Sequence, residues 1–156
     1  MQATELLLFN LEEVRRRSVI VWQGIPAEQL QWRPDAEAMT CLEMVRHVLE
    51  GEWLYMQIIR SGGSLASDET PFTLRPYTDV AAELAFAAPY RAEFLQLVGS
   101  YTAAELSTRK IDRADKGYVR TLGDFLLRIA YHESVHTGQL LGYLRSMAAP
   151  RPNIWD

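Results

Sequence analysis

Four long segments of the chain have the spacing and the end signals of α-helices, and this feature restricts the fold more than any other. The first has apolar residues on one side at helical spacing and charged residues on the other, and Gly24 and Pro26 follow it. Each of the other three begins at a threonine or aspartate that can cap a helix, with Thr78 or Asp79 in this role for the third. The predicted helices are residues 4–23, 40–60, 79–100 and 121–147.

The rest of the chain contains no convincing strand with alternating apolar and polar residues. We therefore predict an all-α four-helix bundle, up-down-up-down, with longer crossover loops. With 156 residues, the chain fits a single domain over 1–156. Pro89 inside the third segment predicts a kink or a later start. Thr102 can cap a further short helix, and the charged segment 109–120 is either irregular or a short hairpin.

Composition excludes several classes of protein. The net charge is −4 with no block of Lys or Arg, which argues against a nucleic-acid partner. No apolar run approaches the ~20 residues that a membrane span needs, and the first residues lack a signal-peptide pattern. Cys41 is the only cysteine, so an intrachain disulfide is impossible, and we expect it to be a small buried apolar residue. We expect a cytoplasmic protein.

The three histidines of the chain are the strongest functional signal. His132 and His136 are four residues apart, which places them one helical turn apart and ~40° apart around the axis. His47 lies midway along the second helix, and all three are predicted to face inward. Three buried imidazoles without a shared partner would leave polar nitrogens unsatisfied. This favours one divalent metal ion bound by all three, over the alternative of core or surface histidines without a metal.

The sequence His-Glu-x-x-His also occurs in zinc proteases, which take a third ligand from further along the chain. After His136 the chain has neither histidine nor glutamate, and only Asp156 could serve. A zinc protease is therefore disfavoured. Glu133 is a candidate acid/base for a metal-bound water, and the alternative is a solvent-facing carboxylate or one that supports a ligand.

These motifs together resemble those of the DinB superfamily of metal-binding four-helix bundles, which includes the YfiT-like proteins. The resemblance covers nearly the whole chain. It rests on Leu30-Gln31-Trp32-Arg33-Pro34, Thr40 to His47, Thr121 to Asp124, and His132-Glu133-x-x-His136-x-Gly138-Gln139. It implies that His47, His132 and His136 are the metal ligands. Members of this family often form homodimers, so the resemblance also implies a homodimer.

Roles can also be predicted for other residues near the three histidines. Gln139 and Tyr143 lie ~20° from His132 around the helix, so they either support a ligand, contact a substrate, or serve ordinary packing. Gly51 and Gly138 are expected to permit close approach of helices. Trp32 is expected to pack as a plug against the bundle.

The resemblance also implies a range of activities. Three neutral imidazoles leave coordination positions open, as in catalytic metal sites. The family includes transferases and isomerases that use low-molecular-weight thiols, and metal-dependent hydrolases. We expect a metal-dependent thiol S-transferase that acts on small electrophiles in stress or detoxification. The alternatives are a hydrolase and a non-catalytic metal-binding or structural dimeric module. Zinc or nickel is the expected ion, with iron or manganese as further candidates.

Overall fold

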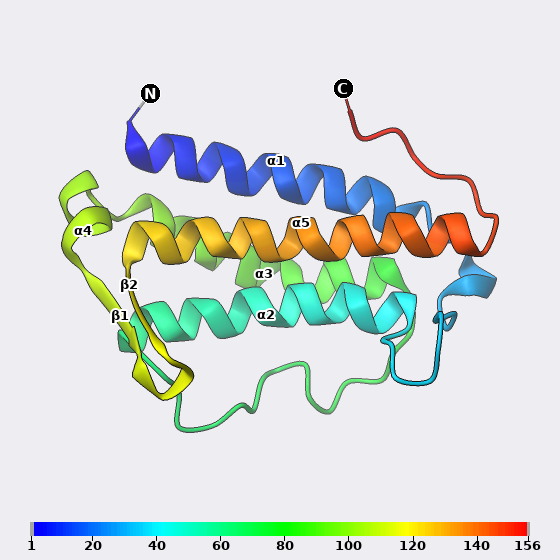
Figure 1. Ribbon diagram of the computed structural model, residues 1–156, viewed down its shortest axis with the longest axis horizontal. Coiled ribbons are helices and arrows are strands. Elements are labelled where there is room, and N and C mark those ends of the chain that lie inside the picture. Colours follow the sequence, from blue (N-terminus) through cyan, green and yellow to red (C-terminus); the bar gives the residue numbers. More distant parts are fainter. Residues whose placement is uncertain (1, 156) are drawn as a thin grey trace.

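Four long helices make up most of the computed structural model, which describes residues 2–155 (Figure 1). Each of them packs against two of the others: α1 and α2 both contact α3 and α5. The mostly helical fold is therefore as predicted. Asp156, the one candidate ligand after His136, lies outside the described residues. The long helices are α1 (Ala3–Gln23), α2 (Cys41–Ser61), α3 (Val80–Gly99) and α5 (Leu122–Ser146).

The directions of these helices differ from the prediction. An ion pair joins Arg46 to Glu83 near the starts of α2 and α3, and another joins Arg60 to Glu93 near their ends. The two helices are therefore parallel. Figure 1 shows α1 and α5 running one way and α2 and α3 the other, so the order is up-down-down-up. The predicted up-down-up-down order is wrong.

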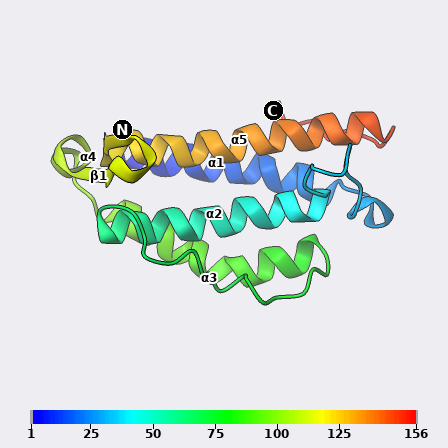
Figure 2. The same ribbon diagram turned by 60° about the horizontal axis from the view of Figure 1, so that its bottom comes forward.

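The segment between α2 and α3 accounts for the difference. Residues 62–79 run back along the length of the molecule (Figure 2). An extended chain of this length can span ~60 Å, about twice the ~30 Å length of α2. The Arg46 guanidinium holds the far end of the segment, because it donates to the backbone carbonyls of Arg75 (2.7 Å) and Pro76 (2.9 Å). The chain can thus start α3 beside the start of α2.

Capping residues set the helix starts where the sequence predicts them. The Thr40 hydroxyl accepts from the Glu43 amide (3.2 Å), and the Glu43 carboxylate accepts from the Thr40 amide (2.7 Å). The Asp79 carboxylate caps α3, so its later start is excluded, and the helix continues through Pro89. Thr121 caps α5 in the same way.

A small hairpin and three short helices fill the connections. The hairpin consists of β1 (Lys110–Arg113) and β2 (Tyr118–Thr121), which pair antiparallel around η2 (Ala114–Lys116). The amide of Asp112 donates to the carbonyl of Gly62 (2.8 Å), which fixes the hairpin beside the end of α2. The remaining short helices are η1 (Ala27–Gln29) and α4 (Ala103–Thr108).

Two clusters of buried apolar residues form the core, one around Trp22 and Phe72 and the other around Phe94 and Phe125. Cys41 is fully buried in the first cluster, as predicted. Trp32 packs edge-on against Tyr143, with ring centroids 5.2 Å apart, which fits the predicted plug. No helix within residues 2–155 is both long and apolar enough to cross a membrane.

Candidate metal centre

Three imidazoles from two helices converge on one point. His132 Nε2 on α5 lies 3.1 Å from His47 Nε2 on α2 and 3.1 Å from His136 Nε2. One nitrogen from each residue lies within 4.8 Å of the other two. Zinc binds imidazole nitrogen at ~2.0–2.1 Å, so two nitrogens in its tetrahedral shell are ~3.3 Å apart. The two spacings of 3.1 Å are close to this value, and the three side chains could hold a single divalent ion.

Gly51 explains how α2 and α5 come close enough for this arrangement. A Cβ atom at this position would lie 3.3 Å from His132 Cε1. Glycine thus leaves room for the His132 ring against α2, as the sequence predicts. The same prediction for Gly138 is wrong: a Cβ there would meet nothing within 4 Å. Gly138 instead borders a cavity between α1, α5 and the C-terminal segment.

The histidines face a groove between α2 and α5 rather than the core. His47 is exposed, and His132 and His136 are half-buried, so the predicted inward orientation is wrong. The reason is that α2 packs against both α3 and α5, and its buried stripe is centred on residues such as Val45 and Leu49. His47 is two residues from each of these and so lies ~160° away around the helix, on the opposite and exposed face, where a ligand can reach it.

The environment favours the neutral form of the His132 and His47 imidazoles. Burial, together with the neighbouring His136 and His47, lowers the pKa of His132 to about 4. Burial also lowers the pKa of His47, with His136 adding to the effect. Neutral imidazole is the form that binds metals. His136 Nδ1 lies 2.7 Å from Gln139 Oε1, and a proton on Nδ1 that donates to this oxygen leaves Nε2 free to bind an ion.

Glu133 is adjacent to His132 in sequence but faces α1. Its carboxylate accepts hydrogen bonds from Arg15 Nε (2.8 Å) and Nη2 (3.0 Å). Arg15 also bonds to Glu52 (3.2 Å), which pairs with Arg91. The structure therefore places Glu133 in a buried ion-pair network and does not bring its carboxylate to the histidines.

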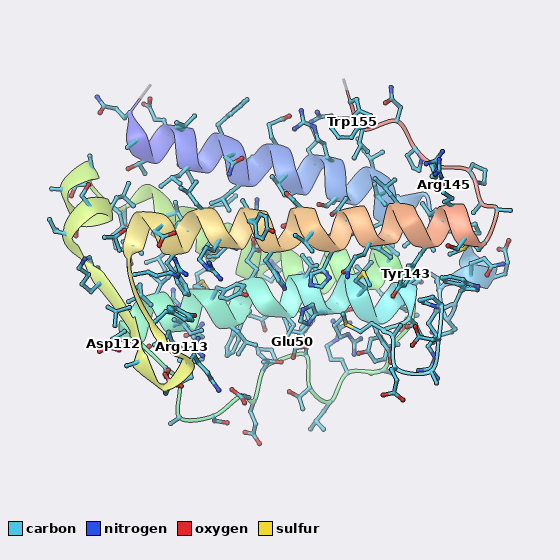
Figure 3. All side chains as sticks on the ribbon, viewed as in Figure 1. Glu50, Asp112, Arg113, Tyr143, Arg145 and Trp155 are labelled. Carbon is cyan, nitrogen blue, oxygen red and sulfur yellow. The ribbon has the colours of Figure 1, made fainter. Side chains whose placement is uncertain are left out.

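Tyr143 lies further along α5 than the ligands. Figure 3 shows it toward the C-terminal end of this helix, whereas Arg113 lies near the opposite end of the molecule. The Tyr143 ring packs against Trp32, so its observed contact is one of packing. A role for Tyr143 in substrate binding stays a prediction.

Cavities give access to His47 and His132. One of about 450 Å³ is bordered by His47 and His132, and a second of about 370 Å³ lies on another side of His47. Within residues 2–155, no cysteine or carboxylate joins the histidines in a metal-binding group. Cys41 is excluded as a fourth ligand by its place in the core, where burial raises its pKa to about 11.

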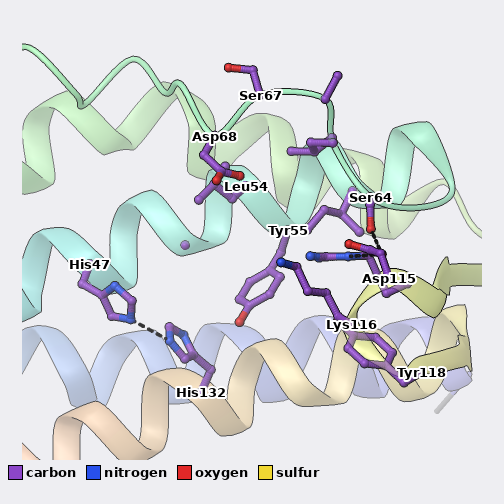
Figure 4. Close-up of a pocket in the computed structure, with 15 residues that line it drawn as sticks. His47, Leu54, Tyr55, Ser64, Ser67, Asp68, Asp115, Lys116, Tyr118 and His132 are labelled. Carbon is purple, nitrogen blue, oxygen red and sulfur yellow. Dashed lines mark hydrogen bonds and ion pairs between the residues drawn. The ribbon is translucent and has the colours of Figure 1, made fainter.

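The larger cavity also contains residues that the sequence analysis missed (Figure 4). Tyr55 had a signal, because His47, Gly51 and Tyr55 are spaced four apart and share one face of α2. No signal in the sequence points to Arg113 and Lys116. Both belong to the hairpin, and only the tertiary fold brings the hairpin to this cavity.

Comparisons with known proteins identify the family and agree with the fold. The family model of the DinB superfamily matches residues 10–140. The crystal structure of a DinB-like protein (YjoA) from Bacillus subtilis has the same fold: the TM-score is 0.71, the identity 23%, and the similarity covers 96% of each chain. A search of curated proteins found no match.

Proposed function

Since the chain belongs to the DinB superfamily, we propose that it is a metal-dependent enzyme whose ion is bound by His47, His132 and His136. Zinc or nickel is the proposed ion, with iron or manganese as further candidates. The observation that carries this proposal is the convergence of three histidine Nε2 atoms, two of them on side chains that border an open cavity. A structural metal site would be closed by a fourth protein ligand.

An ion at this site supplies Lewis acidity, which lowers the pKa of a water or a thiol that it binds. The chain's own residues hold the ion with neutral imidazoles and leave its formal charge of +2 unreduced. The cavity of about 450 Å³ lies within the size range of sites for small molecules.

Among possible activities, we propose thiol S-transfer to small electrophiles, in stress or detoxification. In this reaction the thiolate sulfur forms a bond to the electrophilic carbon, the leaving group departs with its bonding pair, and the thiol proton goes to solvent. Two cavities meet at His47, which supports a reaction of two molecules. The second candidate is a hydrolase, which needs only one organic substrate and water. A metal-binding module without turnover is the third.

The test combines metal titration with activity. Tag-free protein is loaded with zinc or nickel and incubated with a chromogenic chloroarene, with and without a low-molecular-weight thiol, and separately with a nitrophenyl ester. Turnover of the chloroarene that requires the metal and the thiol, and is lost in His47→Ala, supports S-transfer. Ester cleavage without thiol supports the hydrolase, whereas neither activity with any bound ion contradicts both.

We also propose a homodimer that uses the outer surfaces of α1 and α5. Apolar side chains are exposed there: Phe9 is 55% exposed, Leu127 53% and Tyr131 70%. Exposed apolar patches commonly mark contacts with other proteins. Sedimentation equilibrium of the native protein and of Tyr131→Glu tests this, and a native monomer would contradict it.

A further inference from the structure

We infer that the cavity beside the histidines binds small molecules with an anionic group, a carboxylate or a phosphate, through Arg113, Lys116 and Tyr55. This inference rests on the proposed function only in one respect: the end of the bound small molecule that is opposite its anionic group would reach the metal ion. His47, His132 and the three anion-binding residues all border the same cavity of about 450 Å³. It therefore names the class of substrate that the enzyme takes.

Arg113 provides the main evidence. Its side chain is only 14% exposed, and its Nε is buried without a hydrogen-bond partner among residues 2–155. The nearest carboxylate oxygen, Asp115 Oδ1, is 3.9 Å away, too far for a hydrogen bond, and it already accepts one from Ser64. Burying this N–H donor of the guanidinium without an acceptor is unfavourable. A bound carboxylate or phosphate would supply the acceptor.

Two further donors border the same space. Within residues 2–155, no hydrogen bond or ion pair fixes the Lys116 ammonium or the Tyr55 hydroxyl. The Tyr55 ring is held between His132 and Phe125, with centroid distances of 5.6 and 5.7 Å. Figure 4 shows Tyr55 and Lys116 between the His47–His132 pair and the Ser64–Asp115 pair. An anion at this point would lie within the cavity and apart from the metal ligands.

The cavity also contains two acidic residues, Asp68 and Asp115. They offset the formal charges of Arg113 and Lys116, and the hydrogen bond from Ser64 leaves the charge of Asp115 in place. With neutral histidines, a bound divalent ion makes the whole cavity positive. The arrangement therefore favours an elongated anion, with its charged group at the hairpin and its reactive group at the histidines.

The test uses three probes of similar length: hexanoate, butylphosphonate and the neutral hexanamide. Binding to metal-free and zinc-loaded protein is followed by ¹H–¹⁵N correlation NMR. We expect at least one anion to shift amide signals of the hairpin and to bind at least tenfold more tightly than hexanamide. A preference for hexanoate indicates a carboxylate substrate, and a preference for butylphosphonate indicates a phosphate.

Variants assign the binding to the named residues. Arg113→Ala should weaken the preferred anion roughly tenfold or more, as expected for loss of a charged hydrogen-bond partner. Lys110→Ala is the matched control, because Lys110 is an exposed cation that lies on the same hairpin but does not border the cavity. The affinity of this variant for the anion should equal that of the native protein. Thermal melts check that each variant is folded, and Arg113→Gln, which also removes the charge, serves if Arg113→Ala does not fold.

The inference is overturned if hexanamide binds as tightly as both anions, or if the folded Arg113 variant binds them as the native protein does. Metal content is measured on the same samples. Anion binding that depends on Arg113 in a protein that takes up no metal would keep this inference and remove the proposed enzyme. Full metal content without anion binding would do the reverse.

Discussion

Neighbouring residues of α5 face two different surroundings. Glu133 and Thr137 face α1, where Arg15 donates to the Glu133 carboxylate and the Ser18 and Thr137 hydroxyls lie 2.8 Å apart in a hydrogen bond. His132 and His136, each one position earlier, face α2, where their nitrogens meet another histidine. Both regions are polar, and both join α5 to a neighbouring helix.

The difference lies in how the polar groups are satisfied. On the α1 side each buried charge has an opposite charge beside it, so the region is complete without a ligand. On the α2 side three groups of the same kind face one another beside open cavities, and only a cation would satisfy all three lone pairs. Pairing indicates a structural role, whereas convergence without a partner indicates a binding site.

The largest effect should come from breaking the paired region. Glu133→Ala leaves the Arg15 guanidinium, which is 12% exposed, without its main partner. Removing one member of a buried ion pair costs about 3–5 kcal/mol. We expect the free energy of unfolding, measured by urea denaturation of the metal-free protein, to fall by about this amount.

His132→Ala is the matched variant for that experiment. It removes a polar side chain from the groove, so the metal-free stability should change by less than about 1 kcal/mol. Equal losses of stability in the two variants would mean that the two regions do not differ in the way proposed.

A smaller effect is expected from Gln139, which accepts a hydrogen bond from His136. Removing such a partner of a ligand typically lowers metal affinity roughly 10–100-fold. Competition with a metal-binding dye should therefore show weaker binding in Gln139→Ala. Unchanged affinity would show that the amide does not orient the His136 ring.

The smallest effect concerns Cys41, on the buried side of α2. Its pKa is raised to about 11, so its thiolate is suppressed in the folded protein until the pH approaches that value, whereas an unfolded chain ionises near pH 8.5. At pH 8.5 iodoacetamide should label the urea-unfolded chain and leave the native protein unmodified. Rapid native labelling, or loss of metal in Cys41→Ser, would place this thiol at the site instead.

Local signals in the sequence predict much of this structure. Thr40, Asp79 and Thr121 mark helix starts because capping depends on a few adjacent residues. The proximity of His132 and His136 can also be predicted from local sequence, because spacing along one helix fixes the relative positions of side chains.

Features that depend on distant segments could not be read in this way. The length of segment 62–79 allows α3 to start at either end of α2, so the helix order was open. The partner of Glu133 comes from α1, and local spacing cannot show whether its carboxylate turns toward Arg15 or toward the histidines. Arg113 reaches the cavity because the neighbouring Asp112 of the hairpin bonds to Gly62 at the end of α2. No pattern in the sequence predicts this contact.

The most direct test compares metal content in two variants of adjacent residues. Tag-free native protein, His136→Ala and Thr137→Val are incubated with zinc, nickel and manganese in turn, dialysed, and analysed for metal per chain. We predict close to one ion per chain in the native protein and in Thr137→Val, and little in His136→Ala. Full metal content in His136→Ala, or no metal in the native protein with any of these ions, would contradict it.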